Sequence, residues 1–171
     1  MKSKLKHYIE QEVYNGCSYK KKFYYKYIAA PTNAVYLIRK FQFSRNKILS
    51  IFYRKRLVDK YGIFISKKTV IGIGLKLPHP QGIIFGEHTI LGENCTVYQQ
   101  VTFGSSKRGN IERTCQPEIK DNCIFYAGSK VIGNITVSSN TILGANSVLI
   151  KNTDKDGGIY VGTPAKKINK L

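Results

Sequence analysis

Three histidines could carry a proton near neutral pH, and their sequence surroundings differ. His7 lies in a Lys-rich segment and His88 in a predicted turn, so both are most simply solvated surface residues. His79 stands between Pro78 and Pro80, whose rings restrict the backbone on both sides of it. A rigidly held imidazole suits a general base, because proton transfer requires geometry before it requires a particular pKa. The alternative is a packed structural histidine.

Metal chemistry is not expected from this chain. A zinc site of the hydration type needs several converging histidines, which the sequence does not supply. The four cysteines show no CxxC spacing, and phosphate-loop and dinucleotide fingerprints are absent too. The cysteines are Cys17, Cys95, Cys115 and Cys123. We interpret them as thiols of a reducing compartment and, because no apolar leader or bilayer-spanning run is evident, expect a cytoplasmic protein.

The elements that must position His79 follow from a six-residue period between Phe64 and Ile150. Large apolar residues recur at Ile65, Ile71, Leu77 and Ile83, then, after a two-residue slip, at Phe85, Leu91, Val97 and Phe103, and finally at Ile119, Phe125, Val131, Val137, Leu143 and Leu149. The residue four places on is usually small or β-branched: Thr69, Thr89, Cys95, Val101, Cys123, Ser129, Thr141 and Ser147. This pattern predicts a parallel β-helix in which each hexad supplies one short strand and one turn.

The repeat excludes an antiparallel sandwich, which would show a period of two and irregular turn spacing. Three strands per coil would align the large side chains into one apolar column, with Gly, Asn and Asp at the corners between strands. Counting hexads places Gln99 one coil after His79 and Ala127 one coil further. Gln99 is therefore a candidate to orient His79 or to contact a substrate. The alternative is a polar ladder residue with no role.

Two domains are expected: a basic, Tyr-rich helical segment over residues 1–62 and the β-helix over residues 63–168. Apolar residues at helical spacing, such as Leu49, Tyr53 and Leu57, predict short helices in the first segment, and Pro31-Thr-Asn33 is a helix start signal. Residues 104–117 break the hexad and are polar and basic, which predicts a loop on one edge of the solenoid.

The charge of the chain is lopsided, with 28 Lys and Arg against 10 Asp and Glu. Such a field favours an anionic partner. Interleaved Lys and Tyr residues in the first segment could bind nucleic acid, but a helical cap over the open end of the solenoid, which also helps subunits to associate, explains them better. We expect no nucleic-acid partner and keep peripheral contact of this basic segment with an anionic membrane as a further possibility.

The stretch from about Ile65 to Ile168 resembles a known protein family. Beside the hexads, the motifs are Leu77-Pro-His-Pro-Gln-Gly-Ile-Ile-Phe-Gly86, Gln99-Gln-Val-Thr-Phe-Gly104, Tyr126-Ala-Gly-Ser129, Gly144-Ala-Asn-Ser147 and Gly162-Thr-Pro-Ala-Lys166. They resemble the left-handed β-helix acetyltransferases of the serine acetyltransferase and capsular polysaccharide O-acetyltransferase group. The resemblance implies a left-handed coil and a homotrimer with acetyl-CoA bound between neighbouring solenoids. It also implies that His79 is the catalytic histidine.

The reaction implied by the resemblance is direct acyl transfer, with His79 as general base and a backbone N–H near Gly104 or Ser105 holding the developing oxyanion. The implied acetyl-CoA contacts are the small residues Ala127, Gly128 and Ala145, which would pass the pantetheine, and Lys151, Lys166 and Lys167, which would meet the phosphates.

Departures from the serine acetyltransferase pattern concern the acceptor. Pro78 stands where an acidic residue precedes the catalytic histidine, Phe64 where a supporting carboxylate is usual, and Cys115-Gln116 where the loop carries an Arg-His pair. From these absences we expect a sugar hydroxyl of a capsular or surface polysaccharide as acceptor. The residues expected to bind it are Gln99, Lys107, Arg108, Arg113 and Gln116, the three loop cations facing an acidic polymer.

Two alternatives stay open. One is a serine O-acetyltransferase of cysteine biosynthesis, and the other is a non-catalytic hexapeptide scaffold. The scaffold is disfavoured because an inert solenoid would need neither His79 nor the Gly162-Thr-Pro-Ala-Lys166 tail.

Overall fold

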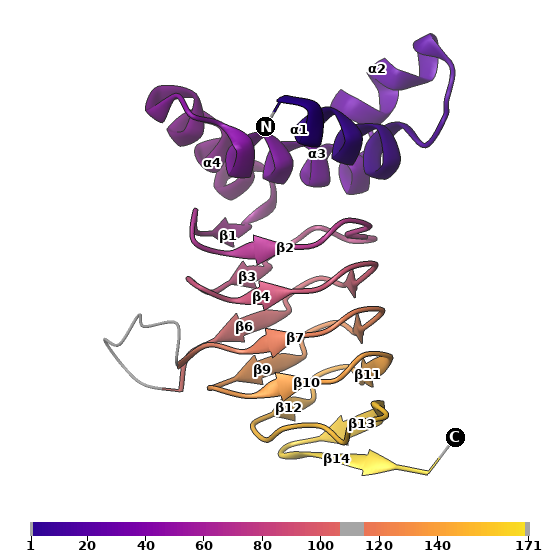
Figure 1. Ribbon diagram of the computed structural model, residues 1–171, viewed down its shortest axis with the longest axis vertical. Coiled ribbons are helices and arrows are strands. Elements are labelled where there is room, and N and C mark those ends of the chain that lie inside the picture. Colours follow the sequence, from indigo (N-terminus) through magenta and orange to yellow (C-terminus); the bar gives the residue numbers. More distant parts are fainter. Residues whose placement is uncertain (1, 107–114, 170–171) are drawn as a thin grey trace.

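The computed structural model describes residues 2–106 and 115–169, and it places a group of helices at one end of a long solenoid (Figure 1). The helical elements are α1 (Lys2–Ile9), a π-helical turn η1 (Glu10–Tyr14), α2 (Tyr19–Tyr27), α3 (Ala30–Phe43) and α4 (Lys47–Tyr61). The C-terminal strands lie at the opposite end of the molecule.

Three sheets form the walls of the solenoid. One contains β1 (Phe64–Ile65), β3 (Ile84–Phe85), β6 (Thr102–Gly104), β9 (Lys130–Ile132) and β12 (Val148–Leu149), and we call it sheet A. Sheet B contains β2 (Val70–Ile71), β4 (Ile90–Leu91), β7 (Glu118–Ile119) and β10 (Thr136–Val137). Sheet C contains β5 (Thr96–Val97), β8 (Ile124–Phe125), β11 (Thr141–Leu143), β13 (Gly158–Gly162) and β14 (Ala165–Ile168). Strand pairing is parallel throughout except between β13 and β14.

Strand register explains the phase of the sequence repeat. Ile84 of β3 pairs with Thr102 of β6, which lies three hexads further along the chain. Phe64 pairs with Ile84, so the first coil contains the two extra residues of the slip that follows His79. Thr102 pairs with Lys130. These two residues are more than three hexads apart in the sequence because the coil between them carries the loop. The parallel β-helix predicted from the period of six is confirmed.

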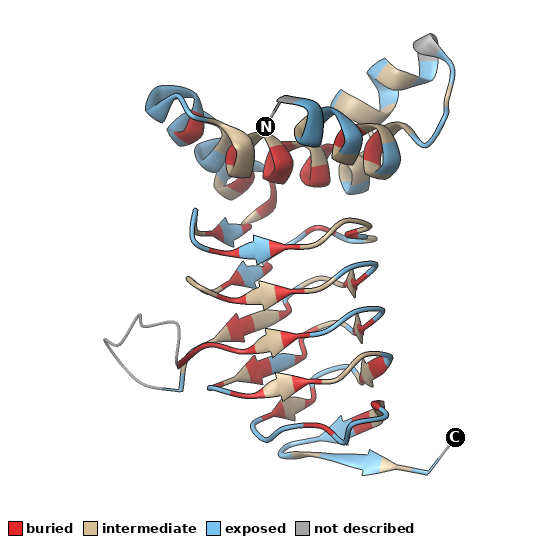
Figure 2. Cartoon of the chain, in the orientation of Figure 1, coloured by how far each residue is buried: buried red, intermediate tan, exposed pale blue. Residues whose placement is uncertain are grey.

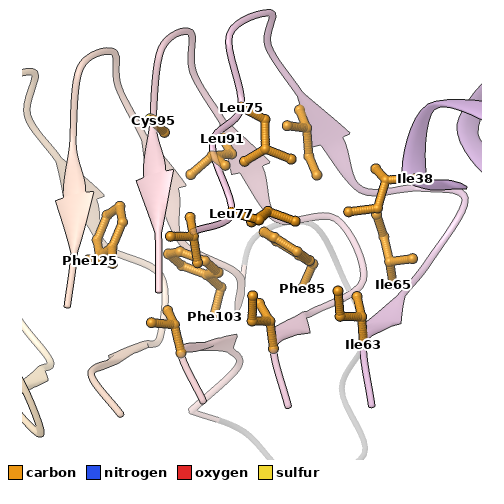
Figure 3. Packing of buried hydrophobic residues seen from close by; sticks show 14 of the residues in the cluster. Ile38, Ile63, Ile65, Leu75, Leu77, Phe85, Leu91, Cys95, Phe103 and Phe125 are labelled. Atoms are coloured by element: carbon orange, nitrogen blue, oxygen red, sulfur yellow. The ribbon is translucent and has the colours of Figure 1, made fainter. Parts of the chain in front are cut away.

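The core is the column of large side chains that the repeat predicts. Every predicted large anchor is buried, none more than 5% exposed, and so are the small positions between them. Figure 2 shows buried residues recurring along the strands of successive coils. Phe85 and Phe103 stack with ring centroids 5.6 Å apart, and Phe103 meets Phe125 edge to face at 4.9 Å (Figure 3). The two-residue strands each contribute one buried residue, so stability comes from stacking coils rather than from any single coil.

Local signals set the helix ends only in part. The predicted start signal, Pro31-Thr-Asn33, lies inside the first turn of α3 and not before it, because the helix already begins at Ala30. The Asn46 side chain caps α4 by accepting hydrogen bonds from the N–H groups of Ile48 and Leu49. Gly62 ends α4 in the left-handed region at φ 61°, where the chain turns into β1.

A buried ion pair joins the helices to the first coil. The guanidinium of Arg39 on α3 donates to both carboxylate oxygens of Glu12, at 2.6 and 2.7 Å, and both side chains are fully buried. Arg39 also donates to the carbonyl of Ile71 at 2.9 Å, while the Glu12 carboxylate accepts from the N–H groups of Gly74 and Leu75. The pair therefore satisfies backbone groups at the open end of the solenoid, which the helices cover.

None of the helices in the described part of the chain is both long and apolar enough to cross a membrane.

Candidate active site

His79 lies at one corner of the solenoid, where sheet C leads into sheet A. Lys76 bridges to Thr96 of β5, and this register continues into the turns that follow. The corner is formed in successive coils by Pro78–Pro80, Tyr98–Gln100, Tyr126–Gly128, Gly144–Asn146 and the β13–β14 turn Gly162–Pro164. We call this column of turns the His79 edge.

Backbone hydrogen bonds fix the spacing of the His79 edge. The N–H of Gln100 donates to the carbonyl of Gln81 at 2.8 Å, that of Gly128 to Gln99 at 2.9 Å, and that of Asn146 to Ala127 at 2.9 Å. These hydrogen bonds join each turn of the edge to the turn of the next coil.

The His79 side chain is exposed and projects from the solenoid instead of entering its core. Its ring lies beside that of Tyr98, with centroids 6.0 Å apart and planes at 46°. Tyr98 in turn stacks on Tyr126 of the next coil, with centroids 5.2 Å apart. No hydrogen bond reaches the imidazole from elsewhere in residues 2–106 or 115–169. Aromatic contact with Tyr98 is thus what fixes one side of the imidazole in the single chain.

Gln99 offers a polar atom without a partner at the same level. Its Oε1 is buried and accepts no hydrogen bond within the described residues. A buried amide oxygen without a donor is costly, by roughly 1–3 kcal/mol, so this atom is a candidate to accept a hydrogen bond from a ligand, from water or from another chain.

The small residues that were expected to lie beside the pantetheine are found along the His79 edge, in the coils that follow Gln99. Ala127 and Ala145 occupy equivalent positions of consecutive turns, half-buried and exposed respectively. Gly128, at φ 70°, is required by the stacking itself, because a Cβ there would come within 2.1 Å of Asn146 Oδ1. After Tyr98 and Tyr126, the His79 edge therefore carries small side chains at these positions.

Gly104, Ser105 and Gln116 lie at a different corner, where sheet A leads into sheet B. Gly104 ends β6, about 13 Å along an extended strand from the His79 edge. Gln116 is buried at this second corner, where its Oε1 has no partner in the described chain and faces Gly86. A single chain therefore does not bring these three residues to His79.

The predicted phosphate-binding lysines lie toward the C-terminal end of the solenoid. Lys151 and Lys166 are exposed. Lys167 Nζ pairs with Asp154 Oδ2 at 2.9 Å, and this carboxylate raises the pKa of Lys167. The remaining predicted cations, Lys107, Arg108 and Arg113, lie outside the described residues.

Sequence reasoning missed Tyr98, Tyr126 and Lys130 at this edge. Hexad counting stacks Gln99 and Ala127 on His79, and Tyr98 and Tyr126 directly precede these two residues. The tyrosines could therefore have been found from the sequence by also considering the residues next to each stacked position. Lys130 begins β9, and its Nζ donates to the carbonyl of Gly128 at 2.9 Å. No signal distinguishes that lysine from other outward lysines of the repeats.

The larger hollows among the described residues lie around the helices, and one of about 160 Å³ reaches the His79 edge only at Pro78. A groove of about 630 Å³ is lined by Ser50 and Arg54 of α4 and by Lys67 of the first coil. Another, of about 280 Å³, lies between α2, α3 and α4. Neither is lined by His79. In the described residues no group of three or more His, Cys, Asp or Glu side chains is placed to hold a metal ion.

Comparison with known proteins yields one consistent name. No protein-family profile matches the chain. A serine acetyltransferase of Buchnera aphidicola is 31% identical over 125 residues, which cover 73% of this chain and 45% of that protein. A serine acetyltransferase of Staphylococcus xylosus is 40% identical over 103 residues, which cover 60% of this chain and 46% of that protein. The chain thus spans a little under half the length of these curated relatives.

Solved structures agree with the sequences. The serine acetyltransferase of Neisseria gonorrhoeae superposes with a TM-score of 0.76 at 25% identity, covering 98% of this chain and 66% of that chain. The same enzyme in complex with serine gives a TM-score of 0.73, covering 96% and 69%. The fold class expected from the resemblance, a left-handed parallel β-helix with a short helical N-terminal segment, is confirmed.

These comparisons overturn one expectation. The matching proteins are named serine acetyltransferases, so a capsular or surface polysaccharide as acceptor, and with it a carbohydrate partner, is wrong. That expectation rested on the absence of expected side chains at Phe64, Pro78 and Cys115-Gln116. A missing side chain excludes one way of holding an amino acid, but it does not exclude the amino acid.

Sequence and structure point to the same relatives. The supporting observations are the hexad column, the three-walled solenoid, the edge that carries His79, and the matching sequences and structures. The chain belongs to the hexapeptide-repeat acetyltransferases with a left-handed β-helix, in the group that includes the serine acetyltransferases.

Proposed function

We propose that the chain transfers the acetyl group of acetyl-CoA to the hydroxyl of serine, with His79 as general base. The observation that carries this proposal is the His79 edge, where an exposed imidazole held between two prolines lies level with the buried, unpartnered Oε1 of Gln99. The names of the relatives support serine as acceptor, and one solved relative was crystallised with serine.

The proposed step balances without a metal or a redox partner. The imidazole of His79 takes the hydroxyl proton while the serine oxygen attacks the thioester carbonyl carbon. The carbon–sulfur bond then breaks, and the CoA sulfur leaves with the proton that His79 returns. His79 thus ends the reaction in the state in which it began.

Other residues of the chain bind and orient. Gln99 Oε1 would accept a hydrogen bond from the serine ammonium group, which supplies the donor that this atom lacks. Ala127, Gly128 and Ala145 would leave room for the pantetheine along the His79 edge, while Lys151, Lys166 and Lys167 would meet the CoA phosphates. The cations Lys107, Arg108 and Arg113 remain proposed substrate contacts, with the serine carboxylate as their target in place of an acidic polymer.

A homotrimer follows from the same reasoning. The N–H groups of Gly104 and Ser105, proposed for the oxyanion, and Gln116, proposed for the substrate, lie one strand length away from His79 in the same chain. Packing solenoids side by side would place the loop corner of one copy against the His79 edge of the next. The proposed active site then lies between two copies, where both halves meet.

The experiment is thiol release from acetyl-CoA by the purified chain, with serine as acceptor and with glycerol or no acceptor as controls. We expect release that depends on serine, and O-acetylserine identified by mass spectrometry. Release that is equal without serine would contradict the proposed acceptor. Contact of the N-terminal segment with a membrane is independent of this chemistry, because it depends on a different surface.

A further inference from the structure

The first half of α4 presents its apolar side chains to solvent instead of to the protein. Ile48 is 77% exposed, Ile51 68% and Phe52 53%, and their spacing places them on one helix face. The opposite face carries the buried Ser50 and Leu57. We call Ile48, Ile51 and Phe52 the α4 ridge. Exposed apolar side chains that lie together on one helix face are typical of an interaction site.

Cations flank the α4 ridge on both sides. Helical spacing places Lys47 and Arg54 along one flank and Arg56 along the other, and all three are exposed. Lys55, on the ridge itself, pairs with Asp59 at 2.7 Å. No ion pair engages Lys47, Arg54 or Arg56 within the described chain.

A basic groove of about 630 Å³ adjoins the ridge, and Ile51 is one of its lining residues. Arg45, Lys47 and Arg54 line it from the α3–α4 connection and α4, and Lys67 and Lys68 line it from the first coil. Lys67 Nζ donates to the carbonyl of Ser44 at 2.8 Å, and Lys68 pairs with Glu87, the acidic lining residue, at 2.8 Å. Arg45, Lys47 and Arg54 are left to meet an anion from outside.

From this arrangement we infer that the α4 ridge and the basic groove bind the surface of an anionic phospholipid bilayer. Ile48, Ile51 and Phe52 enter the boundary between headgroups and acyl chains, and Arg45, Lys47 and Arg54 pair with lipid phosphates. The helices form the end of the molecule opposite the C-terminal strands, so docking there brings only the coils next to the helices toward the bilayer and leaves the rest of the solenoid in water (Figure 1).

Charge and side-chain chemistry favour a bilayer over two other occupants. The first sixty residues carry 15 basic and 3 acidic residues, so the same face of a second copy would be repelled. Nucleic acid offers phosphates, but its bases stack on aromatic side chains and give no apolar phase for Ile48 and Ile51. An anionic bilayer offers phosphates with an apolar layer directly behind them.

The test is flotation of the full chain with vesicles of phosphatidylcholine, alone or mixed with phosphatidylglycerol, without acetyl-CoA or serine. We expect at least about tenfold stronger partitioning onto the anionic vesicles, weakened by salt. Ile48→Ser with Ile51→Ser should lower it about tenfold or more, and so should Lys47→Gln with Arg54→Gln. Val70→Ser, which removes an exposed aliphatic side chain from β2, and Lys155→Gln serve as matched controls and should change nothing.

Several results would overturn the inference. Partitioning that is absent, or equal on neutral vesicles, would do so, as would ridge variants that float like the parent chain. Without vesicle binding, a doubling of the assembly that Ile48→Ser with Ile51→Ser abolishes would assign the ridge to a second copy. Oligonucleotide binding in the same circumstances would assign the groove to nucleic acid. Thiol release by the ridge variants is measured separately and should equal that of the parent chain, so failure of either proposal is recognised on its own.

Discussion

At the scale of single residues, the exposed imidazole of His79 and the buried oxygen of Gln99 divide the proposed work between proton transfer and recognition. The Tyr98 ring supports one side of the imidazole, and the Tyr126 ring supports Tyr98. A base held in this way loses little freedom when the acceptor hydroxyl arrives.

Removing the imidazole tests the first role. His79→Ala should lower kcat for serine-dependent thiol release by roughly 10²- to 10⁴-fold, because proton transfer from the hydroxyl loses its acceptor. His7→Ala is the matched control, since the exposed His7 lies on α1 and not at either corner of the proposed site, and it should leave kcat unchanged. A His79→Ala protein that turns over at the parent rate would refute the assignment.

Removing the amide tests the second role. Gln99→Leu should lower kcat/KM for serine by roughly ten- to a hundredfold, the value of one hydrogen bond to a charged group, with KM for acetyl-CoA unchanged. The effect is read from initial rates at varied serine. Gln81→Leu changes an exposed glutamine near the same edge and should have no effect. If both variants behave alike, Gln99 does not contact the substrate.

At the scale of elements, the helices and the first coil depend on one another through the Glu12–Arg39 pair. A buried pair is costly to assemble but more costly to halve, since the surviving charge has no partner. Glu12→Gln should therefore reduce the free energy of unfolding by about 3–5 kcal/mol, measured by urea denaturation. Asp59→Asn, which breaks the exposed Lys55 pair, should cost less than about 1 kcal/mol. Equal losses in the two variants would mean that the buried pair does not hold the helices in place.

The sequence predicts these elements unevenly, for physical reasons. The solenoid was predictable because every coil repeats one burial pattern, so the anchors reinforce each other as evidence. The direction of α4 was not, because Leu49 and Tyr53 share helical spacing with the buried Leu57, yet Leu49 is 48% exposed. The Glu12–Arg39 pair links residues 27 positions apart and follows no local pattern.

In the candidate site, the residues that the hexad repeat stacks on His79 were predictable, whereas the residues next to them in the sequence were less so. Hexad counting relates His79 to Gln99, but the ring that lies beside His79 belongs to Tyr98, the residue before Gln99. The acceptor was misjudged because absent side chains were given weight as evidence. Binding groups can come from other positions or from another copy of the chain.

At the scale of the whole molecule, the proposed site needs more than one copy of the chain. Light scattering after size exclusion should give about three times 19.4 kDa, because the two halves of the site lie at different corners of one solenoid. A monomer with full activity would contradict this.

Mixing two inactive variants gives the sharper test. His79→Ala damages one half of the site, and Ser105→Pro removes a backbone N–H from the other. If the site lies between copies, subunit exchange should restore roughly a quarter of the sites, where two intact halves meet. Two samples of the same variant, exchanged in the same way, should stay inactive. Mixtures that stay equally inactive would place both halves within one copy.

The loop corner at residues 104–117 has one more consequence. The strands on either side of it pair as if nothing intervened, Leu91 with Ile119 and Phe103 with Val131. Extra length is therefore absorbed between two rungs and is not passed on to the coils below. A reporter peptide spliced into this corner should therefore leave the ladder of strands intact, so a loss of serine-dependent thiol release in such a protein would report damage to the proposed site and not to the solenoid.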